Sequence, residues 1–298
     1  MNVTLLLNPA ARRGLAGKRL GRIVAIFQRH GIAVDVVLSE SPGDIERRVA
    51  ALCAAGVDLV VMAGGDGTVH EAVNGYMREA DSSPTALSLI PTGSGNDFAK
   101  AAGLDRSFET ATVKLAQKIA ANADPRSVDL GRCNDRYFAN GVGIGFDALV
   151  THYANGVTLP IGDGVYLYGL VRALIHGVVT PRYRVAGSGV DYSGQTTLAN
   201  IANGPWLGGR FRIAPDANHR DGLLNLVLAE PVRRRRILAL LPALVRGRHL
   251  GAPEVQHTTL DKLTIESDAP VLSHIDGELM PAASRFEIEC LPGALRFL

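Results

Sequence analysis

Two short glycine-rich motifs carry the residue types that phosphate chemistry requires. The first, GGDGT at residues 64–68, follows the apolar run 60–63. Glycines let backbone N–H groups approach an anionic oxygen without an intervening Cβ, and the amino terminus of a following helix favours negative charge. The pattern therefore predicts a phosphate cradle, although a motif of this kind is by itself also typical of an ordinary tight turn.

The second motif, PTGSGNDFA at residues 91–99, follows the apolar run 86–90. If both apolar runs are strands of one parallel sheet, the two motifs emerge at the same carboxyl edge, where open α/β folds bind ligands. We therefore expect the two turns to converge on a single crevice. Mg²⁺ prefers few carboxylates together with phosphate oxygens and water, so Asp66 in the first motif is the natural candidate to hold this ion.

A third candidate for chemistry is the tripeptide Asp276-Gly277-Glu278. A carboxylate such as Glu278 can take the proton of a hydroxyl whose oxygen attacks a phosphoryl group. Asp-Gly is also the strongest short signal for a β-hairpin, and by itself the motif is better interpreted as such a turn. The same two interpretations, a functional site and a turn, stay open for Asp221-Gly222.

The elements that must position these motifs begin with an alternation of short apolar runs and helical patterns over the first 126 residues. Strands are expected at 3–7, 34–38, 58–63 and 86–90, with helices that reach about residues 30, 55 and 76. Alternation of this kind predicts a parallel sheet covered by helices.

The character of the sequence changes after Asp124-Pro125 to short strands and glycine turns. Strands are expected at 137–142, 183–190, 198–202, 223–228 and 263–266, interrupted by helices at 164–177 and 233–248. We therefore predict two domains. An α/β domain covers 1–126, with the carboxyl end 289–298 as a candidate to return to it, and a mainly β domain covers 127–288.

The bulk composition narrows the function classes. A net charge of +2, from 31 basic and 29 acidic residues, gives no global basis for binding nucleic acid, which needs a concentrated basic surface. Three widely spaced cysteines without a CxxC pair indicate neither a disulfide framework nor a zinc site, and they fit a reducing cytoplasm. At the amino terminus the apolar run precedes the charges, which is the wrong order for a secretory signal.

Membrane spanning is not expected either. The longest clean apolar stretch, 237–245, is about half of the roughly 20 residues that a spanning helix needs.

The two glycine-rich motifs together, GGDGT followed by PTGSGNDFA, resemble the diacylglycerol kinase catalytic family, which also includes sphingosine kinases and bacterial lipid kinases. The resemblance covers nearly the whole chain and continues in Leu7-Asn8-Pro9, Val128–Gly131, Gly143–Asp147, Asp221–Leu223 and Asp276–Glu278. It implies a Rossmann-like amino-terminal domain, similar to those of phosphofructokinases and NAD kinases, followed by a mainly β sandwich domain that binds lipid. His70 stands where many bacterial members have asparagine, and it resembles the sphingosine kinase branch.

The activity that the resemblance implies is ATP-dependent and Mg²⁺-dependent phosphorylation of a lipid hydroxyl, such as that of diacylglycerol, in phospholipid metabolism. Glu278 would act as the general base, supported by Asp276, and Asp66 would hold the catalytic metal. The nucleotide would be held by Asn8, Gly64, Gly65, Asp66, Gly67, Thr68, Gly93, Ser94, Asn96 and Asp97. One metal network would use Asp66, Asp97 and Asp129, and a second, structural Mg²⁺ site would use Asn218, Asp221 and Leu223.

The segment 233–249 brackets apolar residues with arginines on both sides. Such a segment could rest on an anionic leaflet, but its composition favours a packed helix with a solvated basic end. The run 165–171 is similarly ambiguous between a core helix and a lid that faces lipid. With the resemblance, these segments lead us to expect a cytoplasmic protein bound peripherally to the inner face of the membrane, with a homodimer as a further expectation.

Two rival functions stay open. A kinase of a soluble acceptor is suggested because GGDGT also resembles NAD kinases and phosphofructokinases, whereas PTGSGNDFA argues against it. A nucleotide-binding regulator without turnover would have lost its metal or base residue, and both Asp66 and Glu278 are present.

Overall fold

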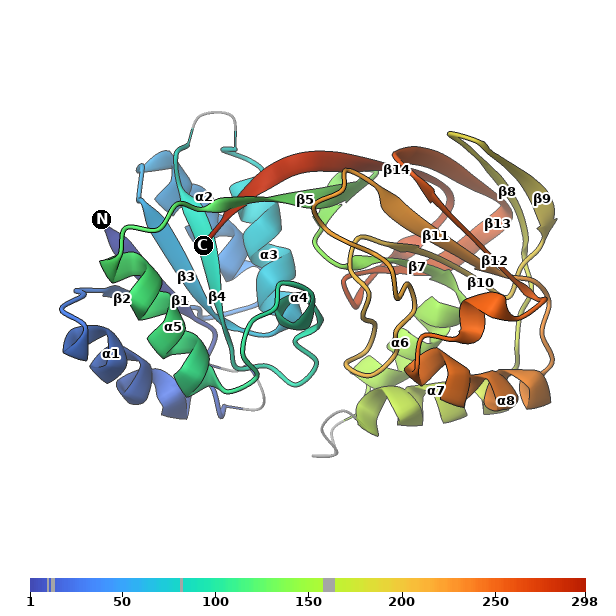
Figure 1. The fold of residues 1–298 in the computed structure, drawn as a ribbon. Coiled ribbons are helices and arrows are strands. Elements are labelled where there is room, and N and C mark those ends of the chain that lie inside the picture. The colour runs from blue at the N-terminus through green and yellow to red at the C-terminus, as the bar shows by residue number, and fades with distance from the viewer. Residues whose placement is uncertain (10, 12–13, 81–82, 158–163) are drawn as a thin grey trace. The chain divides into compact units, whose positions relative to one another are not determined.

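The computed structural model describes residues 1–9, 11, 14–80, 83–157 and 164–298, and the chain folds into two units. Unit 1 comprises Met1–Asp129 and Gly293–Leu298, and unit 2 comprises Leu130–Pro292. Two long strands, β5 (Arg126–Cys133) and β14 (Glu278–Phe297), carry the chain from one unit to the other (Figure 1).

Unit 1 contains the predicted parallel sheet. Its strands lie in the order β2 (Asp35–Leu38), β1 (Val3–Leu7), β3 (Leu59–Gly64), β4 (Ala86–Pro91) and the end of β14, all parallel to their neighbours. Leu7 lies opposite Ala63, and Ala63 lies opposite Ile90. Strands β1, β3 and β4 therefore end level with one another, so the polar residues that follow them emerge at one edge of the sheet.

Helices cover both faces of this sheet (Figure 1). On one face α1 (Leu20–Arg29) and α5 (Phe108–Ala120) pack against alternate strand residues such as Val3 and Leu5. On the other face α2 (Asp44–Ala54) packs beside α3 (Asp66–Tyr76). The short helices η1 (Gly17–Arg19) and α4 (Asp97–Ala101) complete the unit. Because both faces are buried, the central strands are continuous apolar runs.

Unit 2 is mainly antiparallel. Its strands are β6 (Arg136–Phe138), β7 (Gly141–Gly145), β8 (Arg182–Gly187), β9 (Val190–Gln195), β10 (Leu198–Ala202), β11 (Leu224–Ala229), β12 (Val255–Leu260) and β13 (Lys262–Ile275). Neighbours follow the order β12-β11-β10-β7-β13-β14, and β13 also pairs with β8, which pairs with β9. Their inward side chains, including Ile144, Tyr183 and Ile201, form one apolar cluster. The predicted fold class, a parallel α/β domain plus a mainly β domain, is confirmed.

Three helices lie beside this β structure: α6 (Phe146–Asn155), α7 (Gly164–His176) and α8 (Arg234–Val245), with a short helix η2 (His249–Gly251) after them. Helices α7 and α8 were predicted from the sequence, whereas α6 was missed and its residues were included in the β-rich region. The helix begins directly after Gly145, which has φ +84°, and the strand before it gives no helical periodicity. Among the described residues, no helix has both the length and the apolarity that crossing a membrane needs.

Two predicted strands were also wrong in extent. The expected strand 183–190 is a hairpin of β8 and β9, because Gly189 adopts φ +80° and the chain reverses at Ser188-Gly189. The expected strand 137–142 is divided between β6 and β7. Both errors follow from apolar residues that continue across a reversal or break, where only a turn residue marks the boundary.

Candidate active site

The polar residues after strands β1 and β3 contact one another at the carboxyl edge of the unit 1 sheet. The N–H of Asn8 donates to the carbonyl of Ala63 at 3.2 Å, and the Asn8 side-chain nitrogen lies 3.5 Å from Thr68 Oγ1. Thr68 is buried in the first turn of α3, and a Cβ on Gly64 would overlap its side chain. Glycine at position 64 is therefore needed for this close approach.

The two glycine-rich turns touch each other. The carbonyl of Gly64 accepts hydrogen bonds from the N–H groups of Thr92 at 2.8 Å and of Gly93 at 3.1 Å. A Cβ on Gly65 would lie 2.9 Å from Gly93 Cα, and a Cβ on Gly93 would lie 2.7 Å from Asn96 Oδ1. The backbones thus approach more closely than any side chain would allow, which is the convergence that the sequence predicted.

Asp66 links the start of α3 to the start of α4. Its Oδ1 atom accepts a hydrogen bond from the N–H of Phe98 at 3.2 Å, so one carboxylate spans both turns. Asn96 adopts the left-handed conformation (φ 52°) and donates to the carbonyl of Gly93 at 3.0 Å. Ser94 is exposed at the tip of the second turn. The first N–H groups of α3 have no partner within the helix and favour an anion at this edge.

The other two predicted metal ligands of unit 1 have structural partners. The ammonium group of Lys100 donates to Asp97 Oδ1 at 2.6 Å, and both side chains are largely buried. Asp129, which is buried, accepts a hydrogen bond from the N–H of Gly293 at 2.7 Å. No group of three or more histidine, cysteine or acidic residues suited to a metal occurs among the described residues. Of the three predicted ligands, only Asp66 lies between the two glycine-rich turns, where it bonds the N–H of Phe98.

In unit 2, Asp276-Gly277 forms the predicted two-residue hairpin turn between β13 and β14. Both residues have positive φ, 51° and 89°, and Ile275 pairs with Glu278. The Asp276 carboxylate accepts hydrogen bonds from the N–H groups of Ala139, Asn140 and Gly141, at 2.9, 2.8 and 2.9 Å. This residue therefore ties the hairpin to the start of β7.

Glu278 differs from Asp276 because its side chain is exposed. Its carboxylate makes no hydrogen bond or ion pair within the residues that the structure describes, so it keeps the capacity to accept a proton from a bound molecule.

The predicted structural metal residues Asn218, Asp221 and Leu223 lie together in one turn before β11. Asp221 Oδ1 accepts a hydrogen bond from the N–H of Leu223 at 3.0 Å, and the carbonyl of Asn218 accepts one from Arg220 at 2.8 Å. Gly222 has φ +73°. These hydrogen bonds join residues of the same turn, so an ordinary turn is sufficient to explain the geometry.

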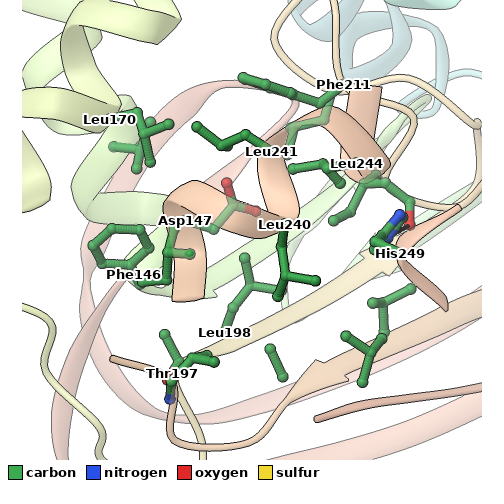
Figure 2. A pocket seen from close by; sticks show the side chains of 18 of the residues that line it. Phe146, Asp147, Leu170, Thr197, Leu198, Phe211, Leu240, Leu241, Leu244 and His249 are labelled. Atoms are coloured by element: carbon green, nitrogen blue, oxygen red, sulfur yellow. Dashed lines mark hydrogen bonds between the residues drawn. The ribbon is translucent and has the colours of Figure 1, made fainter. Parts of the chain in front are cut away.

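An apolar cavity in unit 2 was not predicted from the sequence (Figure 2). It has a free volume of about 130 Å³ and lies between the three helices and strands β10 and β11. Its wall is almost wholly apolar and includes the side chains of Phe146, Leu170, Leu198, Leu241 and Leu244. The apolar faces of the two predicted helices, α7 and α8, are a signal for such a cavity. Its third wall is formed by α6, which was not predicted.

The polar residues in the lining are Asp147, Tyr166, Thr197 and His249. Burial lowers the pKa of His249, whose Nε2 atom lies 3.0 Å from the carbonyl of Ile213, so the ring is neutral near pH 7. Asp147 is buried at the start of α6. An apolar cavity with few polar groups suits a ligand that is mostly hydrocarbon.

Comparison with known proteins extends over the whole chain. The profile of the diacylglycerol kinase catalytic domain matches residues 2–133, and that of the YegS C-terminal NAD kinase beta sandwich-like domain matches residues 140–298. A diacylglycerol kinase of Mycobacterium tuberculosis is 31% identical over 99% of this chain and 94% of its own length. A diacylglycerol kinase of Bacillus subtilis is 25% identical over 92% of this chain and 88% of its own length.

A solved structure has the same fold. The crystal structure of a diacylglycerol kinase from Bacillus anthracis superimposes with a TM-score of 0.74 at 21% identity, covering 99% of this chain and 96% of the other. This likeness concerns the fold alone. The resemblance that the motifs indicated is thereby confirmed by the profiles and by the Mycobacterium relative.

Proposed function

This chain belongs to the diacylglycerol kinase catalytic family, and we propose that it transfers the terminal phosphoryl group of ATP to the hydroxyl of a lipid such as diacylglycerol. The observation that carries the proposal is the direct contact of the two glycine-rich turns at the sheet edge, with Asp66 bonded across them. Phosphoryl transfer depends chiefly on positioning and on neutralising the phosphate charges, and this edge offers both.

The triphosphate is held, in this proposal, by the backbone N–H groups of residues 64–68 and by the turn at 92–97. Support comes from the close backbone contact of Gly65 with Gly93, which places the two turns side by side, and from the exposed hydroxyl of Ser94. Asn8 and Thr68 contact each other at the same edge and add polar groups to it.

Mg²⁺ fits this edge. The ion takes few protein carboxylates and keeps phosphate oxygens and waters, so a cluster of acidic residues is not required. Asp66 would hold it, and when bound it would neutralise the charge that develops on the phosphoryl oxygens. The further ligands Asp97 and Asp129, and the structural ion at Asn218, Asp221 and Leu223, stay predictions of the family resemblance.

Glu278 acts as the general base. Its carboxylate takes the proton of the acceptor hydroxyl while the hydroxyl oxygen attacks the γ-phosphorus, and the bond from that phosphorus to the bridging oxygen breaks to release ADP. Support comes from its exposed carboxylate, which has no partner among the residues that the structure describes, and from the fixed turn that precedes it. Asp276 supports the base by holding that turn to residues 139–141.

The acceptor is a lipid because unit 2 contains the apolar cavity. Its free volume of about 130 Å³ is near that of an engineered cavity of about 150 Å³ that binds benzene, so it takes part of a hydrocarbon chain and leaves the remainder outside. A soluble sugar or nucleotide acceptor would find few polar partners on such a wall. Unit 2 is in this view the lipid-binding domain.

A membrane surface is the place where such a substrate is reached. On α7, Leu167, Val171 and Ile175 recur every fourth residue and are 52%, 46% and 66% exposed, which makes an unusual apolar stripe on a helix surface. Helix α8 packs its Ile237 and Leu241 in one apolar cluster with Leu170 of α7, and the exposed arginines 233–236 lie at its amino end. Apolar and basic side chains together suit an anionic leaflet. Binding at the inner face of the membrane and a homodimer stay proposals.

The experiment is phosphorylation with labelled ATP and Mg²⁺ in the presence of diacylglycerol, phosphatidylglycerol, sphingoid bases and soluble acceptors. We expect label in a lipid. Label confined to a soluble acceptor would overturn the lipid assignment, and no label in any acceptor would favour a regulator without turnover.

Two variants test the residues. Asp66→Asn keeps an oxygen that accepts the Phe98 N–H but removes the charge, and Glu278→Gln removes the base; we expect turnover to fall about 10²- to 10⁴-fold, with nucleotide binding retained in Glu278→Gln. Asp105→Asn and Glu266→Gln are controls, because each weakens only a partly exposed ion pair, with Lys114 and Arg285 respectively. Unchanged turnover in either test variant would refute the role of that residue.

A further inference from the structure

A buried row of polar groups crosses three strands of unit 2. By the strand register, Gly143 on β7 pairs with Asn200 on β10 and with His274 on β13. Gly143 has no side chain, and a Cβ there would overlap both Asp147 Oδ2 and His274 Nε2. The glycine therefore leaves the space into which α6 inserts the Asp147 carboxylate, between Asn200 and His274.

All three polar side chains of this row are buried, at 2% exposure for Asn200, 5% for Asp147 and 1% for His274. Asn200 Nδ2 donates to Asp147 Oδ2 at 2.9 Å. His274 Nε2 lies 3.3 Å from the same oxygen, an electrostatic contact that lacks the alignment of a hydrogen bond. A buried carboxylate needs such partners, because burial without them is costly.

The other ring nitrogen of His274 reaches the hairpin turn that precedes Glu278. Nδ1 accepts a hydrogen bond from the N–H of Gly277 at 3.3 Å, and Asn155 Nδ2 donates to the carbonyl of Gly277 at 3.2 Å. Side chains thus hold both backbone polar groups of the residue immediately before the base. Asn155 is the last residue of α6, and Asp147 lies in its first turn.

The tautomer of His274 follows from these contacts. A ring nitrogen that accepts a hydrogen bond carries no proton, so in the neutral ring the proton is on Nε2, beside the Asp147 carboxylate. Asp147 therefore favours the tautomer that can accept from Gly277, in the way that a neighbouring carboxylate orients a functional histidine.

We infer that His274 and Asn155 are positioning residues for Glu278, and that Asp147 and Asn200 hold His274 in the form that this task needs. The inference rests on the proposed function of Glu278. Because Asp147 also lines the apolar cavity, helix α6 connects the cavity wall with the turn before the base. The alternative is a polar cluster that only stabilises the sandwich, and such a cluster would affect folding without affecting turnover selectively.

Two variants of similar shape distinguish the roles of the two ring nitrogens of His274. His274→Asn keeps an acceptor where Nδ1 lies, whereas His274→Gln keeps a polar group near Nε2 and loses that acceptor. We expect His274→Gln to lower kcat roughly 10- to 100-fold, as misplacement of a reacting group does, with the KM for ATP unchanged, and His274→Asn to retain most of the kcat. Equal kcat values for the two variants would overturn the inference.

Asn155→Asp provides a second test that leaves the core untouched, because Asn155 is exposed; the change replaces the donor to the Gly277 carbonyl by a carboxylate that repels it. We expect a fall in kcat of the same kind with an unchanged unfolding temperature. Asn134→Ala is the matched control, since Asn134 also joins a turn to the backbone of unit 2, at Arg285 and Glu287, seven or more residues along β14 from Glu278. It is expected to lower the unfolding temperature and leave kcat unchanged.

A double variant distinguishes failure of this inference from failure of the proposed function. If His274 acts through Glu278, adding His274→Gln to Glu278→Gln causes no further loss of the residual turnover. Full activity of Glu278→Gln would reject the base itself. The positioning role alone would be rejected if Glu278→Gln were inactive while His274→Gln and Asn155→Asp were fully active. It would also be rejected if the losses multiplied in the double variant.

Discussion

At the scale of single residues, the candidate site depends on glycines that allow two backbones to approach. A Cβ on Gly93 would meet the Asn96 side chain and the backbone of Gly65, and the Gly65 backbone cannot move aside without separating the turns. The motif is thus explained by the contact between the two turns as much as by any contact with phosphate.

Gly93→Ala is accordingly expected to separate the turns and to lower kcat/KM for ATP about 100-fold, because displacements near 1 Å have effects of that size. Gly21→Ala is the control, since no atom lies within 4 Å of the added Cβ and alanine is favoured in the helix there. The measurement is the kinetics of both variants with the unfolding temperature of each. Wild-type kinetics in Gly93→Ala would mean that the turns do not act together.

The sequence identified site residues that belong to a local motif. It did not identify residues whose role depends on contacts with other elements of the fold. Asp66 and Glu278 could be selected because glycines adjoin them. His274 could not, since a histidine in a strand has no local signature, and its role depends on register with Gly143 and on a carboxylate from another element. Lys100, the partner of Asp97, was also missed, although a spacing of three residues in a helix is a local signal.

At the scale of elements, the alternation of apolar runs predicted the parallel sheet because strands buried on both faces need continuous apolar residues. The β-rich unit was harder, because half-buried strands and short turns give weaker periodicity, and the hairpin of β8 and β9 was taken for one strand. Helix α6 was missed because a ten-residue helix directly after a strand, without a polar cap, lacks a clear start signal.

Helix α7 carries a prediction at this scale. Val171→Glu, in the middle of the exposed stripe, is expected to weaken binding to vesicles that contain anionic lipid about tenfold, because an exposed valine that enters the lipid interface contributes roughly 1.5 kcal/mol. Co-sedimentation with vesicles measures this. Val36→Glu on β2 of unit 1 is the matched control, being 42% exposed against 46% for Val171. Equal binding of the two variants would contradict the membrane surface.

At the scale of the whole molecule, the chain enters unit 2 in β5 and returns to unit 1 in β14, so the first sheet is completed by residues from the other end of the sequence. Phe297 is fully buried there, and its ring meets that of Phe98 edge to face at 5.3 Å. Phe98 is also the residue whose N–H binds Asp66. The strand that closes the sheet therefore supports the second glycine-rich turn.

Phe297→Ala is expected to destabilise unit 1 by about 3–5 kcal/mol and to weaken nucleotide binding, since the cavity it leaves adjoins Phe98. Phe286→Ala removes an equally buried ring from the same strand, but within the apolar cluster of unit 2. We expect it to spare nucleotide affinity. Titration of a nucleotide and thermal unfolding of both variants provide the comparison, and equal nucleotide affinities would show that β14 does not support the turn.

The return of β14 also has a consequence for synthesis on the ribosome. Strand β4 receives its neighbour only when residues 293–298 have left the exit tunnel, after the whole of Leu130–Pro292 has been translated. At usual elongation rates that delay is roughly ten to thirty seconds. Throughout it the nascent amino-terminal unit exposes an open strand edge to chaperones and to other nascent chains, and this exposure ends only when residues 293–298 pair with β4.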